Sequence, residues 1–225
     1  MYNILLQIVS DSTATAAAVN AAPESALSLI AKGGIVMIPI GILLICAIYL
    51  SIERYITINK AAKLDPAFMS NIKDMVLNDN IVGAKKLCER TNTPMSRMID
   101  KGISRIGKPI QDIESAIDNV GKLEIYKIEK NVGFLSTIAG LAPMFGFLGT
   151  VFGIIQIFQK ISAEGLQIST VSGGLYVKMI SSAAGLVLGI FAYASYHYLM
   201  LKIDRVANKM EANNQEFIDI LQQPA

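Results

Sequence analysis

Small and hydroxyl-bearing residues lie inside long uncharged stretches of this sequence, where a polar group needs a partner. Residues 131–159 carry no charge over 29 positions, yet they include glycines, a proline and a threonine. On an α-helix, one face of this stretch would present Pro143, Gly146, Thr150 and Gly153. Glycines let a second backbone come close, and a hydroxyl in hydrocarbon requires a hydrogen-bond partner or a water. The pattern favours an inner helix of an assembly that lines a hydrated path.

A second group of this kind follows in residues 169–201. One helical face there would carry a lysine, two serines and two glycines: Lys178, Ser181, Ser182, Gly185 and Gly189. Such ladders also occur where small residues only permit tight helix packing. Two ladders that both carry hydroxyls favour the hydrated path over packing alone.

The charged residues near these ladders limit what they can do. Lys178 would be a charge at a pore mouth, or its stem would reach the outer interface. We favour the second interpretation, because the 23 uncharged residues that follow it suffice to cross a membrane. The single carboxylate between 131 and 201 is Glu164, in a predicted loop. If protons move through this protein, another subunit must therefore supply the titratable carboxylate.

The composition predicts a membrane protein without catalytic machinery. Of 225 residues, 52% are hydrophobic and 17% are charged, against about 25% charged in soluble domains. The net charge of +2 gives no reason to expect a nucleic-acid partner. We find no nucleophile–base set and no metal or cofactor motif, so we expect no enzyme activity, cofactor or metal. The two cysteines, Cys46 and Cys88, are expected to serve packing.

The order of apolar and charged segments predicts an all-α membrane protein with three transmembrane helices and long helices that extend into the cytoplasm. From Pro109 onward, apolar residues recur at helical spacing into the glycine-rich stretch, which predicts one long helix to about Phe158. The predicted segments are an N-terminal periplasmic or interfacial arm (1–31), transmembrane helix 1 (32–53), a cytoplasmic helical domain (54–130), transmembrane helix 2 (131–159), a short periplasmic loop (160–168), transmembrane helix 3 (169–201) and an amphipathic cytoplasmic C-terminal helix (202–225).

Basic residues beside the spans predict the orientation. Nine lysines and arginines flank the spans on the side of the 54–130 domain and the tail, against three on the other side. By the positive-inside rule, that domain and the C-terminus are cytoplasmic, and the N-terminus is periplasmic.

Four stretches of this sequence resemble one known family. They are residues 141–153 (LAPMFGFLGTVFG), 181–190 (SSAAGLVLGI), 98–107 (MIDKGISRIG) and 120–124 (VGKLE). The first two are similar to the second-span and third-span motifs of the ExbB/TolQ/MotA proton-channel family, and the last two are similar to its ExbB branch. The resemblance covers nearly all of the chain after residue 30.

The resemblance implies a multi-pass subunit of the bacterial inner membrane that forms a pentameric ring. Such a ring surrounds the single-span helices of an ExbD-like partner, which carries a proton-binding aspartate. Proton flow then drives a TonB-like protein that powers outer-membrane uptake. By position, Thr150 matches the pore threonine of the second span, and Ser182, beside Ser181, matches the threonine of the third. The position of the family's third-span glutamate is occupied here by Val177, so this chain lacks that carboxyl group.

Other functions compete with this one. A TolQ-like or stator-type transducer in cell-envelope or motility machinery is the nearest alternative. A membrane scaffold that anchors partners and conducts nothing is an alternative from another class, and it would not need the hydroxyl of Thr150. The sequence alone does not distinguish H⁺ from Na⁺, although the lack of an acid in the spans disfavours Na⁺ binding by this subunit alone.

Overall fold

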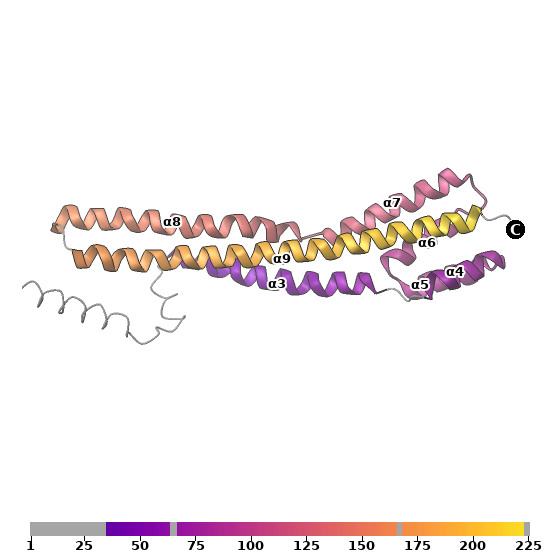
Figure 1. Ribbon diagram of the computed structural model, residues 1–225, viewed down its shortest axis with the longest axis horizontal. Helices are drawn as coiled ribbons and strands as arrows, with labels where there is room; N and C mark the ends of the chain where they lie inside the picture. Colours follow the sequence, from indigo (N-terminus) through magenta and orange to yellow (C-terminus); the bar gives the residue numbers. More distant parts are fainter. Residues whose placement is uncertain (1–34, 64–66, 166–167, 223–225) are drawn as a thin grey trace, which may run out of the picture. The chain divides into compact units, whose positions relative to one another are not determined.

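A computed structural model of the chain describes residues 35–63, 67–165 and 168–222, and these residues form α-helices and no strand. The all-α fold class is thereby confirmed. Figure 1 shows the helices, which are α3 (Met37–Ala62), α4 (Phe68–Leu77), α5 (Ile81–Thr91), α6 (Pro94–Ile103), α7 (Ile110–Glu129), α8 (Gly133–Glu164) and α9 (Ile168–Gln222). The predicted N-terminal arm, 1–31, lies outside the described residues.

Three helical stretches are long and apolar enough to cross a membrane. They lie in Met37–Ala62, Ile110–Ala163 and Val171–Gln222, with mean hydropathies of 1.8, 2.0 and 1.7 in their most apolar windows. Few residues in these windows are buried within the chain itself, so their apolar side chains face outward, as lipid or neighbouring subunits would require. The chain is therefore a multi-pass membrane protein.

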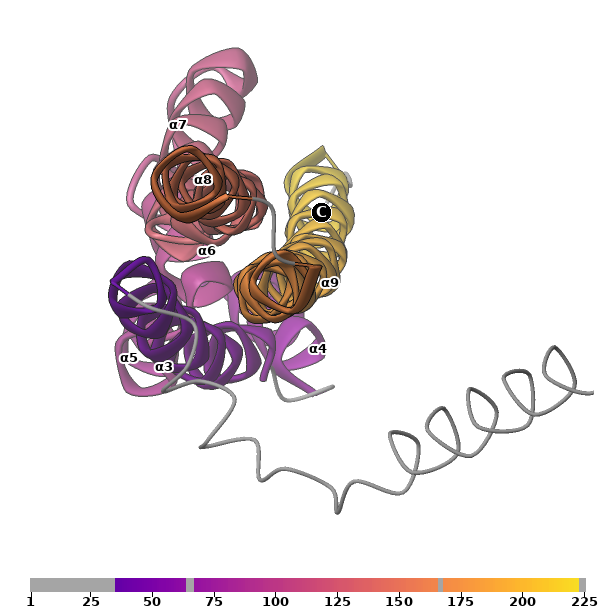
Figure 2. The same cartoon turned by 90° about the vertical axis from the view of Figure 1, so that its left-hand side faces the viewer.

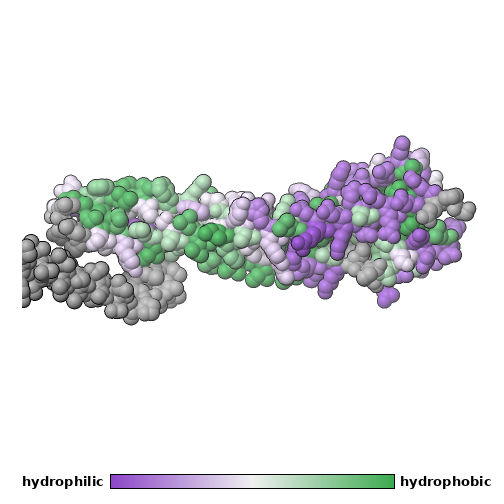
Figure 3. Space-filling model, in the orientation of Figure 1, coloured by the Kyte–Doolittle hydropathy of each residue, from purple (hydrophilic) through white to green (hydrophobic). Residues whose placement is uncertain are grey.

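The chain divides into two compact units, each described here by itself. The first contains the part of α8 from Pro143 and the part of α9 up to Leu186, together with the start of α3. These parts of α8 and α9 run antiparallel and side by side, both along their length and seen end-on (Figures 1 and 2). Hydrophobic side chains dominate the visible surface over this pair (Figure 3).

The second unit contains the rest of α3, all of α4–α7, the beginning of α8 and the end of α9. Its core is built where α4–α7 pack against one another and against the last turns of α9. Ile72, Ile99, Ile117 and Phe217 are completely buried there. Charged and polar side chains cover the visible surface over α4–α7 (Figure 3), as an aqueous environment requires.

Short-range signals in the sequence define the helix starts in this unit. Pro94 is the first residue of α6, and Thr93 before it forms a capping box with Ser96. This is the position where proline costs no hydrogen bond. Asn80 caps α5 by accepting a hydrogen bond from the amide of Gly83 at 3.0 Å. Pro109 directly precedes α7, so both prolines mark the start of a helix.

The prediction of one unbroken helix from Pro109 to Phe158 is wrong. Helix α7 ends at Glu129 and α8 begins at Gly133. Between them Asn131 has a φ of 69°, a left-handed conformation that asparagine tolerates better than most residues. The guanidinium of Arg54 on α3 donates a hydrogen bond to the carbonyl of Lys130 at 2.8 Å and so satisfies a carbonyl at the end of α7.

The opposite difference occurs at the C-terminal end. We expected the third span to end near residue 201 and a separate tail helix to follow, but α9 continues without interruption from Ile168 to Gln222. At Lys202 the composition changes from uncharged to charged residues, but the backbone remains α-helical on both sides.

The cysteines have different environments. Cys88 on α5 is buried, and burial, reinforced by the carboxylates of Asp100 and Glu89, raises the pKa of its thiol to about 12. Cys46 on α3 is exposed on the chain. The packing role that we expect for both cysteines is therefore observed within the chain for Cys88 only.

A buried carboxylate connects α6 and α7. The side chain of Glu124 is 4% exposed, and it accepts hydrogen bonds from Arg97 on α6 and from Lys127 one turn further along α7, the latter at 2.7 Å. Burial acts to raise the pKa of Glu124, but the hydrogen bonds from these two cations outweigh it and hold the pKa below its usual value. The ionised form of Glu124 therefore stabilises this unit.

We expect Glu124→Gln to lower the free energy of unfolding by about 2 kcal/mol at pH 7, the typical contribution of a hydrogen bond to a charged group. Because the folded-state pKa is lowered, this stabilisation is complete above the ordinary glutamate pKa of about 4.3 and is lost as the pH falls through the lower value. The measurement is thermal unfolding of both proteins in detergent between pH 3 and 7. Glu114→Gln, at an exposed position of the same helix, is the control. A constant difference between wild type and Glu124→Gln over this pH range would contradict the prediction.

Candidate functional site

The two ladders predicted from the sequence meet in the first unit, where they form the contact between α8 and α9. Gly146, Gly149 and Gly153 of α8 are all buried at this contact. A Cβ atom at Gly146 would lie 3.0 Å from the Cα of Ser182, and one at Gly149 would lie 2.7 Å from the Oγ of Ser181. The antiparallel register therefore places Gly146 opposite the Ser181–Ser182 pair, with no room for a side chain between the two backbones.

Lys178 lies across the same contact, opposite Gly153, which is one turn beyond Gly149 on α8. A Cβ atom at Gly153 would fall 2.0 Å from the Cγ of Lys178, so the lysine stem occupies the space that Gly153 leaves open. Gly153 is thus required by the aliphatic part of a charged side chain. The predicted role of Lys178 as a pore-mouth charge stays a prediction, as does its alternative role at the interface.

The hydroxyl groups of the two ladders differ in exposure. Ser181 is completely buried, and its hydroxyl donates to the carbonyl of Lys178 at 2.8 Å. Thr150 is partly exposed, and its hydroxyl donates to the carbonyl of Phe147 at 2.6 Å. Ser182 is also partly exposed. Each hydroxyl oxygen keeps lone pairs that accept hydrogen bonds, so Thr150 offers an accessible acceptor to a water or to a protonated carboxyl group.

The remaining predicted residues lie on the same helices. Gly185 is buried on α9, one turn beyond Ser181, and Pro143 is half-buried in the interior of α8. Because proline has no amide hydrogen, the carbonyl of Ala139 lacks its usual helical donor. The structure thus brings Gly146, Gly153, Ser181 and the stem of Lys178 together inside the chain and leaves Thr150 and Ser182 at its partly exposed edge.

Large apolar side chains surround this contact on its outer faces. Phe147, Phe152, Phe158, Met179 and Leu186 are each more than 50% exposed. Among the residues that the structure describes, no three His, Cys, Asp or Glu side chains gather as a metal site would require. The chemistry available where the two ladders meet is that of hydroxyls, backbone carbonyls and the ammonium group of Lys178.

Two glycines of the second unit explain the stretches that resemble the ExbB branch. A Cβ atom at Gly102 would lie 2.6 Å from the side chain of Ile117 and 2.7 Å from that of Phe217. A Cβ atom at Gly121 would lie 3.0 Å from the Sδ of Met98. These glycines let α6, α7 and α9 approach closely. Gly121 lies inside α7 as a packing position.

Arg54 is a residue whose role sequence reasoning missed. We used it only as one of the basic residues that predict orientation. In the structure it is 8% exposed, forms an ion pair with Glu53 and donates to the carbonyl of Lys130. The charged Glu53–Arg54 pair at the end of an uncharged stretch was the available signal, but its partner lies 76 residues away.

Comparison with known proteins supports the same assignment. A family model described as the MotA/TolQ/ExbB proton channel family matches residues 90–212, more than half of the chain. The chain belongs to this family. The match includes α6–α8 and most of α9, and therefore the whole contact between α8 and α9 in the first unit.

Named relatives of this MotA/TolQ/ExbB family member come from both the ExbB and TolQ branches. A protein of Methanothermobacter thermautotrophicus named as an ExbB homolog is 23% identical over 82% of this chain and 66% of its own length. The TolQ protein of the Tol-Pal system from Haemophilus influenzae is 33% identical over 45% of each chain. The biopolymer transport protein exbB1 of Vibrio cholerae is 33% identical over 38% of this chain and 39% of its own length. The matches thus span no more than about two thirds of these relatives.

We expect Gly146→Leu to separate α8 from α9, because its side chain would meet the backbone of Ser181 and Ser182, which cannot rotate away. Overpacking of this kind typically costs about 1–3 kcal/mol. Gly140→Leu, on the same helix, is the matched control, since a Cβ atom there meets nothing within 4 Å. Thermal unfolding of both variants in detergent measures the difference. Equal losses in the two variants would contradict the close contact at Gly146.

Proposed function

We propose that this protein is the channel-forming subunit of a proton-driven energy transducer in the bacterial inner membrane, with its N-terminus periplasmic and its C-terminus cytoplasmic. It forms a homo-oligomeric ring, five-membered as the family resemblance implies, around the span of an ExbD-like partner. The proton motive force then drives a TonB-like protein that energises outer-membrane transport. Membership of the MotA/TolQ/ExbB family supports the proposal.

The observation that carries this proposal is the accessible hydroxyl of Thr150 within a long stretch that has no carboxylate. Residues 131–159 contain no charged side chain, so this stretch of α8 cannot itself bind and release a proton at a carboxylate. A carboxyl group brought by a partner into the ring would have a raised pKa in that low-dielectric environment and would alternate between its two forms. Thr150, whose own hydrogen is donated to Phe147, would accept a hydrogen bond from the protonated carboxyl group or from its waters, and Ser182 would accept or donate.

A tight pair of helices also suits the mechanical part of this proposal. Gly146, Gly149 and Gly153 hold α8 against α9, and the buried Ser181 satisfies its hydroxyl within α9. Each subunit would then contribute one stiff helix pair to the ring wall. A stiff wall of small and hydroxyl-bearing residues would let the partner helix move without breaking strong contacts.

A TolQ-like role in the cell envelope is the second candidate. It is favoured by the 33% identity to the Haemophilus influenzae TolQ protein, which extends over 103 residues. The two candidates share the ring, the acidic partner and the proton pathway, and they differ in the protein that receives the motion. A pull-down with an ExbD-like partner and, in parallel, with the acidic single-span partner of a Tol-Pal system distinguishes them.

Proton flux in proteoliposomes is expected only when the ExbD-like partner is present, because this chain offers no carboxylate of its own in the spans. Flux is measured from an internal pH dye under an imposed potential, with the chain alone and with its partner. The same flux is expected in sodium-free buffer. Flux from the chain alone would contradict the division of roles, and no flux with or without the partner would favour a non-conducting scaffold.

Thr150→Val should reduce partner-dependent flux about tenfold, the effect of losing one hydrogen bond of roughly 1.4 kcal/mol, while leaving ring assembly unchanged. Valine keeps the shape and removes the hydroxyl. Thr137→Val is the matched control, since Thr137 lies on the same helix and also donates to a carbonyl one turn earlier, that of Gly133. Unchanged flux in Thr150→Val, with the partner still bound, would remove the main residue-level support for conduction along this face.

A further inference from the structure

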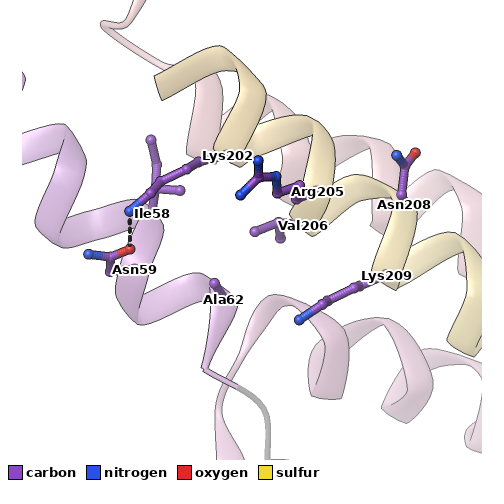
Figure 4. Close-up of a pocket in the computed structure, with 8 residues that line it drawn as sticks. All are labelled: Ile58, Asn59, Ala62, Lys202, Arg205, Val206, Asn208 and Lys209. Atoms are coloured by element: carbon purple, nitrogen blue, oxygen red, sulfur yellow. Dashed lines mark hydrogen bonds between the residues drawn. The ribbon is translucent and has the colours of Figure 1, made fainter. Parts of the chain in front are cut away.

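A basic pocket lies between α3 and α9 in the second unit, just beyond the apolar parts of both helices (Figure 4). Its volume is about 340 Å³, and its lining includes three cations of α9 and polar or small residues of both helices: Lys202, Arg205, Lys209, Asn59, Asn208 and Ala62. In Figure 4 the side chains of Lys202 and Lys209 extend from α9 toward α3. None of the residues that line the pocket is acidic.

The three cations of this pocket have no anionic partner in the part of the chain that the structure describes. Lys202 donates to the amide oxygen of Asn59 at 2.9 Å, and its ammonium group lies 3.9 Å from the ring centroid of Tyr55. The acids of the same stretch, Asp204 and Glu211, are turned roughly 130–150° away from the middle of this basic stripe at 3.6 residues per turn. The pocket therefore holds uncompensated positive charge.

The position of the pocket along the helices corresponds to the headgroup layer of a membrane. Residues 179–201 are uncharged and Lys202 is the first charge after them, while on α3 the uncharged stretch ends at Glu53. The headgroup layer is roughly 5–7 Å deep on each side of the hydrocarbon. Lys202 and Arg205 are three residues apart, which is about 4.5 Å along a helix, so both ammonium and guanidinium lie at this depth.

An apolar groove between the same two helices begins on the membrane side of this pocket. Its volume is about 260 Å³, and its lining includes Ile52, Tyr55, Phe191, Ser195, Tyr198 and Leu199. Tyr55 and Tyr198 stack with their ring centroids 6.3 Å apart, and Lys202 lies over both rings. Lys202 thus joins the basic pocket, which it lines, to the groove that the two tyrosines line.

We infer that the basic pocket and the apolar groove together bind one phospholipid with an anionic headgroup. Lys202 and Arg205 hold its phosphate, Lys209 adds positive charge at the aqueous end of the pocket, and one acyl chain lies in the groove beside Phe191 and Ser195. Basic pockets between membrane helices suit acidic lipid headgroups. A free phosphate would need only the pocket, whereas a lipid uses the pocket and the groove at the depths where its two parts lie.

Native mass spectrometry of the full chain in detergent, titrated with phosphatidylglycerol or phosphatidylcholine, tests this inference. Wild type should retain phosphatidylglycerol in preference to phosphatidylcholine, and the triple variant Lys202→Gln, Arg205→Gln, Lys209→Gln should bind it at least about tenfold more weakly. The matched control Lys86→Gln, Arg90→Gln, Lys101→Gln removes the same charges from exposed positions of α5 and α6 and should bind as wild type does. Equal retention of the two lipids, or equal loss in both triple variants, would overturn the inference.

Two further measurements separate a lipid from a free phosphate. Inorganic phosphate and glycerol 3-phosphate should not compete with phosphatidylglycerol, and effective competition by either would overturn the lipid assignment. Ser195→Phe, which fills the groove and keeps every cation, should weaken phosphatidylglycerol binding, whereas Ala194→Phe, at an exposed position of the same helix, should not. If the basic triple variant fails to fold, Arg205→Gln and Ser195→Phe decide the result, and wild-type binding in both would overturn the inference.

Discussion

The contact between α8 and α9 leaves no room for a side chain, and the first unit depends on this constraint. At Gly146 the neighbouring atoms are the backbone of Ser181 and Ser182, and at Gly153 they are the stem of Lys178. Between membrane helices the hydrophobic effect supplies little attraction, because lipid is as apolar as the side chains, and close packing must hold the helices together. The same closeness buries Ser181 and leaves Thr150 and Ser182 at an accessible edge.

The second unit is held together by different forces, because it has an aqueous surface. Its core is aliphatic and aromatic, and Glu124 within it is compensated by Arg97 and Lys127. Arg54 satisfies the end of α7 at the break before α8. Each of these polar groups is paired, which is the condition under which buried charge is tolerated. The uncompensated cations lie at the exposed edge, on the side of α9 that faces α3.

These features suit a ring subunit whose own residues carry no proton. The hydroxyls of Thr150 and Ser181 already use their hydrogens within their own helices, so what remains at Thr150 is an acceptor. The protonated carboxyl group of a partner can donate a hydrogen bond to this acceptor, whereas the ionised carboxylate, which only accepts, cannot. The predicted lipid pocket lies apart from these hydroxyls in sequence and belongs to the other unit, so the two sites are separate features of the chain.

The sequence by itself determined the all-α class, the three apolar stretches and the helix starts at Pro94 and α7, because these depend on local composition and on residues adjacent in the chain. Only the tertiary structure decided where the helix after Pro109 breaks. Asn131 and Gly133 are weak stop signals alone, and the carbonyl they free is satisfied by Arg54, 76 residues earlier. Tertiary structure likewise decided which glycines serve packing. A glycine is required only where atoms of another helix occupy the space that a side chain would fill, as the stem of Lys178 does at Gly153. The basic pocket needed α3 beside α9, an adjacency that helical periodicity within one segment does not contain.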